Sequence, residues 1–231
     1  MTIFGSPRRH LRSTDSTNAR ARDLAEAGAP NGTVVTADEQ SAGRGRQGRT
    51  WFAPPGSALL YSAILRPADP GDRPLLPLAV PLAVAETVET LATVRCEVKW
   101  PNDVWIEGRK VAGVLIEGKP GSWAIVGVGL NVAVDEFPEE LRETGTSIGG
   151  DATVDAALAA LNERLSDWID ADADRVRDAF AERDALRGRE ISWDGGSGVA
   201  AGIDDVGHLL VALSGGGAVA LGAGEVHLSL A

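Results

Sequence analysis

Apolar positions recur at helical spacing in four segments of the chain. Residues 19–27 form a short amphipathic run that follows polar capping residues and stops at Gly28. Residues 77–93 predict a long buried helix with prolines near its start. Two further helices are predicted from apolar stripes within 158–168 and 176–186.

Short runs rich in β-branched residues predict strands in two parts of the chain. In the first part the predicted strands are 33–36, 58–65, 95–100, 103–106, 109–117 and 123–131. After Gly188, five shorter runs alternate with turns rich in Gly and Asp; they span 190–193, 199–203, 209–213, 218–221 and 226–230. Five strands at this spacing in about 43 residues indicate a small β-barrel.

Charge and composition exclude several classes of function. The 231-residue chain carries a formal net charge of −11, which makes it a poor candidate for sequence-independent binding to nucleic acid or to an anionic membrane. It contains no apolar run long enough for a membrane span, and its first residues lack the apolar region of a signal peptide. The single cysteine, Cys96, cannot form an intramolecular disulfide, and three scattered histidines do not add up to a His/Cys metal cluster. A reducing cytoplasm fits these features.

Residues 43–48, with the sequence GRGRQG, fit the pattern G-x-G-x-x-G. A dinucleotide-binding loop needs a helix directly after it, and a kinase loop needs a V-A-I-K strand; the proline-rich segment that follows supplies neither. What remains is a glycine-rich loop bearing Arg44, Arg46 and Arg49. Glycine lets the backbone approach an anion closely, and guanidinium groups suit phosphate or carboxylate. Taken alone, the loop fits an anion site and an exposed basic loop equally well.

The sequence KWPND at residues 99–103 places a cation and two oxygen-bearing side chains in a stiff turn between two strands. Lys99 is one of three lysines among 22 basic residues, so we interpret it as a positioned cation, with a solvated turn lysine as the alternative. Gly113 interrupts a strand rich in β-branched residues, which indicates close approach by a ligand or another backbone. Asn131 ends a predicted strand, where it is either a turn former or a reader of a nucleobase edge.

Together these motifs resemble the biotin–protein ligases over essentially the whole chain. The motifs STDSTN, EQSAGRGRQGRTW, KWPNDVW, KVAGVLIE, VGVGLNV and TSI stand in the order typical of that family, at residues 13–18, 39–51, 99–105, 110–117, 126–132 and 146–148. The resemblance implies an α+β fold: a mixed β-sheet backed by helices, related to class II aminoacyl-tRNA synthetases, with a small C-terminal SH3-like β-barrel. We therefore expect a catalytic domain over residues 1–186 and a barrel domain over 187–231.

The resemblance also implies a reaction in two steps. The carboxylate of biotin attacks the α-phosphate of ATP to give biotinyl-5′-AMP, and a lysine of a biotin carboxyl carrier domain then takes the biotinyl group. Fixed cations and Mg²⁺ must offset the repulsion between carboxylate and triphosphate, and water must be kept from the mixed anhydride.

The implied roles fall on residues that match the family's motifs. Catalysis is expected from Lys99 and Arg46. Biotin is expected to contact Ser16, Thr17, Asn18, Gln40, Arg44, Gly45, Arg46, Lys99 and Gly113. ATP is expected to contact Arg46, Trp51, Lys99, Asn102, Lys110 and Asn131, and Asp103 is the candidate Mg²⁺ ligand.

Two departures from the family's pattern narrow the expectation. About twelve residues precede the first motif, which favours a monofunctional type without the N-terminal DNA-binding domain of bifunctional members. His227 stands where many relatives have serine, so no contact of the barrel with ATP or the acceptor is assigned. Two other classes stay open: an enzyme of the same superfamily that handles lipoate or octanoate, and a non-catalytic biotin-binding module. The sequence leaves the oligomeric state open, with a homodimer as one option.

Overall fold

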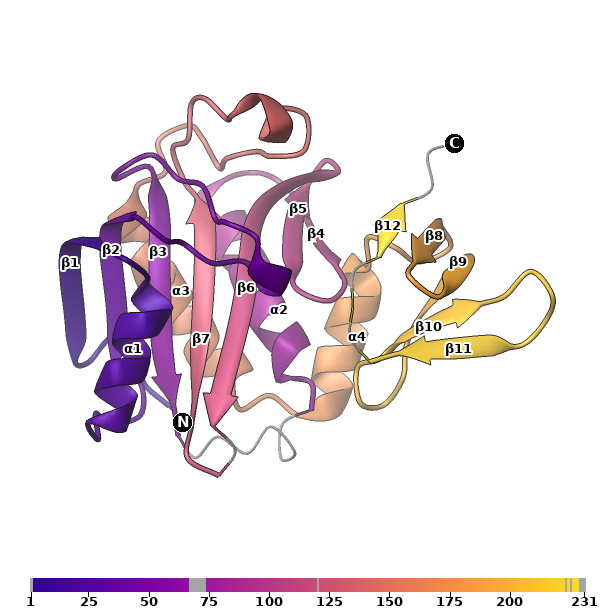
Figure 1. The fold of residues 1–231 in the computed structure, drawn as a ribbon, viewed down its shortest axis with the longest axis horizontal. Coiled ribbons are helices and arrows are strands. Elements are labelled where there is room, and N and C mark those ends of the chain that lie inside the picture. Colours follow the sequence, from indigo (N-terminus) through magenta and orange to yellow (C-terminus); the bar gives the residue numbers. More distant parts are fainter. Residues whose placement is uncertain (1, 67–73, 120, 223, 225, 229–231) are drawn as a thin grey trace.

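A seven-stranded mixed sheet forms the centre of the molecule (Figure 1). The computed structural model describes residues 2–66, 74–119, 121–222, 224 and 226–228. The strand order is β1-β2-β3-β7-β6-β5-β4; β1 runs parallel to β2, and the other pairs are antiparallel. The strands are β1 Arg8–Thr14, β2 Val34–Gln40, β3 Ala58–Leu65, β4 Cys96–Lys99, β5 Asp103–Ile106, β6 Arg109–Lys119 and β7 Trp123–Asn131.

Helices cover both faces of this sheet (Figure 1). The helices are α1 Thr17–Glu26, α2 Leu76–Leu91, α3 Val154–Trp168 and α4 Ala173–Arg183. Helix α1 packs on one face, where Ala21 and Ala25 join Val35, Ile64 and Ile125 in a small apolar cluster. Helices α2 and α3 contribute to the larger core on the other face, and α4 packs beside α2. The predicted α+β class, a mixed sheet backed by helices, is confirmed.

Burial explains why the central strands were predictable. All eight residues of β3 are buried because helices cover both of its faces, so the strand reads as one continuous apolar run. The predicted bounds of β3, β5 and β7 agree with the structure residue for residue. No helix in the described part of the chain is long and apolar enough to cross a membrane, and Cys96 is fully buried, as expected for a small apolar residue.

Strand β1 was not predicted from the sequence. Its residues, RRHLRST, are mostly exposed, so the strand lacks the alternation of buried and exposed positions that marks a half-buried strand. It lies at the sheet edge, where backbone pairing with β2 holds it, with Arg8 opposite Val34 and Thr14 opposite Gln40. Arginines along an edge strand also hinder pairing with another chain.

A second sheet of five antiparallel strands follows α4, in the order β11-β10-β9-β8-β12. The strands are β8 Glu190–Trp193, β9 Gly196–Ile203, β10 Leu209–Ala212, β11 Ala218–Leu221 and β12 His227–Leu228. Residues 229 and 230 of the predicted last strand lie outside the described residues. Ile191, Leu209 and Val226 share one core cluster with Leu186 and the main sheet. The barrel and the boundary at 186/187 therefore stay predictions.

The turn at residues 99–103 contacts the second sheet directly. Nε1 of Trp100 donates a hydrogen bond to the carbonyl oxygen of Gly207, at 3.0 Å, in the turn between β9 and β10. A β-carbon at Gly207 would lie 3.0 Å from a methyl group of Leu75, so this turn packs tightly on the start of α2. The second sheet thus supports the turn that carries Lys99.

Candidate active site

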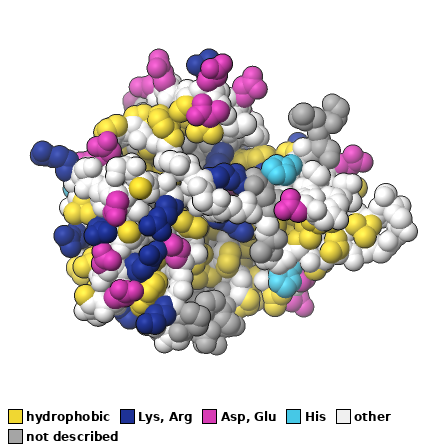
Figure 2. Space-filling model, viewed as in Figure 1, with side chains coloured by type: hydrophobic (Ala, Val, Ile, Leu, Met, Phe, Trp, Pro, Cys, Tyr) yellow, Lys and Arg dark blue, Asp and Glu magenta, His cyan; other side chains and the backbone are white. Residues whose placement is uncertain are grey.

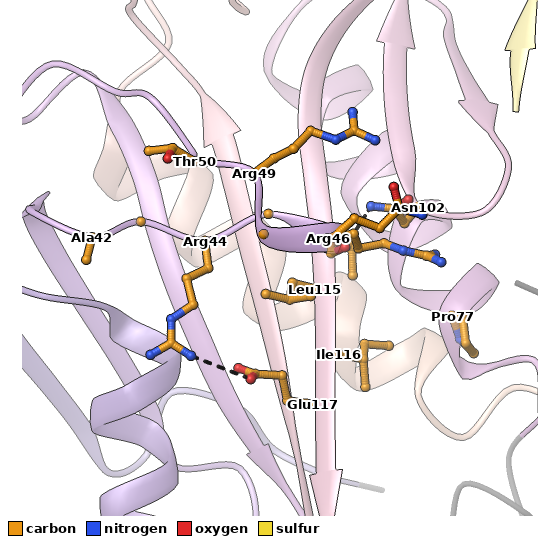
Figure 3. Close-up of a pocket in the computed structure, with 15 residues that line it drawn as sticks. Ala42, Arg44, Arg46, Arg49, Thr50, Pro77, Asn102, Leu115, Ile116 and Glu117 are labelled. Atoms are coloured by element: carbon orange, nitrogen blue, oxygen red, sulfur yellow. Dashed lines mark hydrogen bonds and ion pairs between the residues drawn. The ribbon is translucent and has the colours of Figure 1, made fainter. Parts of the chain in front are cut away.

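A cavity of about 720 Å³ lies between the loop of residues 42–50 and strand β6. Its other lining residues include Pro77, Asn102 and the β6 segment 114–117. Figure 3 shows Arg46 lying beside Asn102, whereas Arg44 extends toward Glu117. The loop predicted from GRGRQG therefore forms one wall of this cavity.

The loop has a defined backbone despite its glycines. Arg44 and Thr50 form an isolated β-bridge, and the backbone N–H of Gly45 donates to the carbonyl oxygen of Arg49 at 2.7 Å. Between them Arg46–Gly48 forms a single 3₁₀ turn. On the face seen in Figure 2, dark-blue Lys and Arg side chains gather over α1 and this loop. Acidic side chains lie among them, and Arg20 and Arg22 are paired with carboxylates, whereas Arg44 and Arg46 line the cavity.

A second, narrower cavity of about 50 Å³ lies against the sheet. It brings together most of the residues predicted to bind biotin or ATP: Ser16, Thr17, Asn18, Gln40, Arg44, Gly45, Arg46, Trp51, Asn102, Lys110 and Gly113. Arg44, Gly45, Arg46 and Asn102 line both cavities, which are therefore parts of one site. Lys99, Asp103 and Asn131 do not line either cavity and stand at ends of the bordering strands β4, β5 and β7.

The floor of the site contains a chain of hydrogen-bonded polar side chains, of which Thr17, Asn18 and Ser62 are buried. The backbone N–H and the hydroxyl of Thr17 both donate to Oε1 of Gln40, at 2.7 and 3.0 Å. The hydroxyl of Ser62 lies 2.8 Å from Oγ1 of Thr17 and 2.6 Å from Oδ1 of Asn18. Nδ2 of Asn18 donates to Oε2 of Glu117 at 2.7 Å. These contacts tie the first turn of α1 to β2, β3 and β6.

Sequence reasoning did not single out Ser62 or Glu117. Ser62 is fully buried, and its signal is a lone hydroxyl within the apolar run ALLYSAIL. Such a residue needs a partner because burying an unpaired hydroxyl is costly. Glu117 stands within the motif at residues 110–117, but its partners on α1 become visible only in the folded chain.

Glycines create room for the side chains that lie on the sheet. A β-carbon at Gly127 would lie 2.2 Å from Oδ1 of Asn18, and one at Gly129 would lie 2.4 Å from Cε2 of Trp51. Gly113 is the cross-strand partner of Gly129, and a β-carbon there would lie 3.1 Å from both Trp51 and Lys110. The interruption seen in the sequence at Gly113 therefore marks a place where side chains approach the backbone closely.

The two lysines near the site, Lys110 and Lys99, each contact an aromatic ring, and Lys110 also pairs with a carboxylate. Nζ of Lys110 lies 2.7 Å from Oδ1 of Asp103 and 5.6 Å from the ring centroid of Trp51. Nζ of Lys99 lies 5.2 Å from the ring centroid of Trp105, a cation–π distance. These contacts limit the directions in which both ammonium groups can point.

Two asparagines are held by their side-chain amides. Asn102 donates from Nδ2 to the carbonyl oxygen of Val114 at 2.9 Å. The backbone carbonyl oxygen of Asn102 accepts from the backbone N–H of Val114 at 3.0 Å. Asn131 donates from Nδ2 to the carbonyl oxygen of Thr146 at 2.9 Å. Its Oδ1 is buried and has no hydrogen-bond partner among the described residues. That oxygen can therefore accept a further hydrogen bond.

Asp15, just before helix α1, is held in place by hydrogen bonds and a nearby positive charge. The carboxylate of Asp15 accepts hydrogen bonds from the backbone N–H of Ser16 and the hydroxyl of Thr14. These bonds and the nearby Arg20 guanidinium hold the pKa of Asp15 below its ordinary value. Asp15 is therefore ionised at neutral pH, and it fixes the backbone where α1 begins.

Asp103 was expected to hold Mg²⁺, and the structure places the Lys110 ammonium beside its carboxylate. Its carboxylate is paired with the Lys110 ammonium, which already offsets its charge. The described residues include no group of three His, Cys, Asp or Glu side chains that could hold a metal ion. Mg²⁺ commonly binds through one or two carboxylates together with the phosphates of a nucleotide. Asp103 as a ligand stays a prediction.

The chain is similar to known proteins over most of its length. Residues 10–132 match the Biotin/lipoate A/B protein ligase family. The biotin--[acetyl-CoA-carboxylase] ligase of Mycobacterium tuberculosis is 36% identical over 235 residues, which cover 93% of this chain and 86% of that protein. The bifunctional ligase/repressor BirA of Bacillus spizizenii is 41% identical over 140 residues, 58% of this chain; the match spans 43% of that relative's length.

The fold is also shared with solved structures. The biotin protein ligase from Aquifex aeolicus in complex with biotin and ATP superposes with a TM-score of 0.80 at 29% identity, covering 97% of this chain and 99% of that chain. The sequence match covers more than half of the chain, and the structural match covers nearly all of it. The chain therefore belongs to the biotin/lipoate A/B protein ligase family.

Proposed function

We propose that this protein is an ATP-dependent biotin–protein ligase. The observation that carries the proposal is one site with two chemically different ends. At one end, the buried side chains of Thr17, Ser62 and Asn18 form a hydrogen-bonded polar chain with the half-buried Gln40. At the other end, Arg44 and Arg46 face the larger cavity. A ligand with a polar ring and a distant carboxylate, such as biotin, matches both ends.

The nucleotide side of the proposal rests on Trp51 and Asn131. An aromatic ring stacks on a nucleobase, and the buried Oδ1 of Asn131 is an acceptor suited to the exocyclic amine of adenine. Relatives with the same fold have been solved with biotin and ATP and with biotinyl-5-AMP. ATP is thus the nucleotide substrate in our proposal.

In the first step an oxygen of the biotin carboxylate attacks the α-phosphorus of ATP. A new O–P bond forms, the bond between the α-phosphorus and the bridging oxygen breaks, and pyrophosphate leaves. Negative charge concentrates where the two anions meet, so cations fixed before the reaction lower the barrier most effectively. We assign this role to Lys99 and Arg46.

In the second step the neutral amine of an acceptor lysine attacks the acyl carbon of the mixed anhydride. An amide bond forms, the acyl–oxygen bond to AMP breaks, and the amine loses its proton. Water competes with the amine until the transfer is complete, so the loop of residues 42–50 has to cover the intermediate. We assign a biotin carboxyl carrier domain as the acceptor, because relatives are ligases of acetyl-CoA carboxylase.

Several finer assignments belong to the same proposal. We assign residues 1–186 to the catalytic domain and 187–231 to an SH3-like barrel, supported by five antiparallel strands that follow α4. A single buried cysteine fits a reducing cytoplasm. The strong negative charge argues against nucleic acid and anionic membranes as partners.

Lipoate or octanoate is the competing substrate within this family. Neither carries hydrogen-bond donors at the end away from the carboxylate. Binding either one would leave the remaining acceptor sites of Thr17, Asn18 and Gln40 facing an apolar group, which is disfavoured. This polar chain therefore favours biotin.

Incubation with radiolabelled biotin, ATP and a carrier domain tests the proposal. We expect biotin-dependent release of pyrophosphate and label on the carrier lysine. If labelled lipoate or octanoate, supplied in place of biotin, is transferred to the carrier and labelled biotin is not, the protein belongs to the lipoate branch. Biotin binding without pyrophosphate release would assign it to the non-catalytic binding modules.

A further inference from the structure

The two carboxylate oxygens of Glu117 have different partners. Oε2 accepts from Nδ2 of Asn18 at 2.7 Å. Oε1 accepts from the guanidinium of Arg22 at 2.8 Å and lies 3.9 Å from that of Arg44, as Figure 3 shows for Arg44. The side chain of Glu117 is 27% exposed, whereas Asn18 is buried. One carboxylate thus contacts both helix α1 and the arginine loop.

This contact, together with a longer one from Nδ2 of Asn18 to the carbonyl oxygen of Leu115 at 3.5 Å, sets which way the Asn18 amide points. An ionised carboxylate only accepts hydrogen bonds, so it requires the Nδ2 end of the amide to face it. Oδ1 must then point away from Glu117, toward Ser62 and over Gly127, which lines the narrow cavity. The amide presents an acceptor, and not a donor, to that part of the site.

We propose that Glu117 is a positioning residue for biotin: it fixes the Asn18 amide so that Oδ1 accepts from a ureido N–H of the substrate. This inference rests on the proposed biotin ligase function. Arg22 contacts the other carboxylate oxygen, Oε1, and therefore does not itself face the Asn18 amide. Without this carboxylate the amide can rotate, and its Nδ2 hydrogens would then face the ureido N–H of biotin, donor against donor.

A simpler role for Glu117 is to pin α1 to β6 through the Arg22 ion pair. The two roles depend on different contacts. Pinning requires the Arg22 guanidinium, whereas positioning requires the charge that faces Asn18. Substitutions that remove one contact and keep the other therefore separate them.

Glu117→Gln is the main test because glutamine has nearly the same shape but can present a donor to Asn18. We expect the KM for biotin in pyrophosphate release to rise roughly tenfold, the usual effect of leaving a buried N–H without its acceptor. The kcat at saturating biotin should stay within about threefold of wild type, because Glu117 does not touch the reacting atoms.

Two comparisons make this result decisive. In an Asn18→Ala background the same Glu117→Gln change should raise the KM by less than about twofold, because the amide it orients is gone. Arg22→Met removes the ion pair but keeps the carboxylate that faces Asn18, so the KM for biotin should stay within about threefold of wild type. If E117Q does not fold, this variant still shows whether the ion pair alone accounts for the effect on biotin.

Equal penalties for Glu117→Gln with and without Asn18 would overturn the inference. So would an Arg22→Met variant with as large a rise in KM as Glu117→Gln. A wild-type protein that releases no pyrophosphate with biotin and ATP would instead overturn the proposed function, so the two failures are distinguishable.

Discussion

The indole ring of Trp51 occupies the space that a side chain at residue 129 would take: a β-carbon on Gly129 would lie 2.4 Å from Cε2 of Trp51. Two residues earlier on the same strand, Gly127 makes the corresponding room for Asn18. Alternate residues of a strand face the same side, so the two glycines divide the sheet surface between Asn18, which we assign to biotin, and Trp51, which we assign to ATP.

We expect Gly129→Ala to impair ATP binding selectively. The new methyl group forces Trp51 off the sheet, and loss of base stacking costs roughly 1–3 kcal/mol. The KM for ATP in biotin-dependent pyrophosphate release should therefore rise by about tenfold or more, with a smaller change for biotin. Gly118→Ala on β6 is the matched control, because the nearest atom to its β-carbon would be 3.5 Å away. An unchanged KM for ATP would contradict the assignment of Trp51.

We expect Gly127→Ala to have the opposite preference. Its β-carbon would displace Oδ1 of Asn18, which lies 2.2 Å from that position. The KM for biotin should rise roughly tenfold, as for a lost hydrogen bond in a buried site, and the KM for ATP should change little. Isothermal titration with biotin alone measures the same effect without catalysis. A larger effect on ATP than on biotin would show that the two halves of the site are assigned the wrong way round.

Lys99→Met should separate the two half-reactions. The substitution keeps much of the bulk of the side chain and removes the charge, so we expect the fold to survive. Loss of one preorganised cation should slow adenylation by about 10²- to 10³-fold, and transfer from preformed biotinyl-5′-AMP should slow less. Pyrophosphate release and carrier labelling measure the two steps. Equal losses in both would mean that Lys99 binds biotin or shapes the pocket without acting in adenylation.

Trp100→Phe should weaken the connection between the two sheets. Phenylalanine keeps a ring in the core but cannot donate to the carbonyl oxygen of Gly207. Leaving that buried contact unmade should cost about 1–3 kcal/mol. Chemical denaturation with circular dichroism measures the loss. If the midpoint is unchanged, the hydrogen bond does not stabilise the position of the second sheet.

The Asp204–His208 contact predicts an acid-sensitive part of the second sheet. Partial burial would raise the pKa of Asp204, but hydrogen bonds from the backbone N–H groups of His208 and Val206, together with the His208 ring, outweigh it and lower the pKa below 3.8. A lowered carboxyl pKa stabilises the fold at pH values above the unfolded-state pKa, and this stabilisation is lost as pH falls through the folded-state pKa.

Asp204→Ala should therefore lower the melting temperature at pH 7. The difference between variant and wild type should shrink as the pH falls below about 4. Thermal unfolding across this pH range measures it. A difference that stays constant down to pH 2 would mean that the charge of Asp204 contributes nothing.

The local sequence pattern alone predicted those elements whose buried positions appear as apolar residues at regular spacing. Strand β3 is apolar at nearly every position because helices cover both of its faces, and α3 carries an apolar stripe at helical spacing. Strand β1 could not be predicted in this way. Its residues are polar and mostly exposed. The strand forms because β2 offers an edge to pair with, and the paired residues Arg8 and Val34 lie twenty-six positions apart in the sequence.

The same distinction applies to the site. Lys99 was a candidate by its residue type and its place in a stiff turn, whereas Asn18 and Gln40 were expected only because their motifs resemble those of the biotin–protein ligases. That Ser62 and Glu117 join them depends on the register of the central sheet and on how α1 lies across it. Gly113 and Gly129 are distant in sequence and become one platform only because β6 and β7 pair at that register. Such contacts arise between side chains on separate elements, so only the tertiary structure decides them.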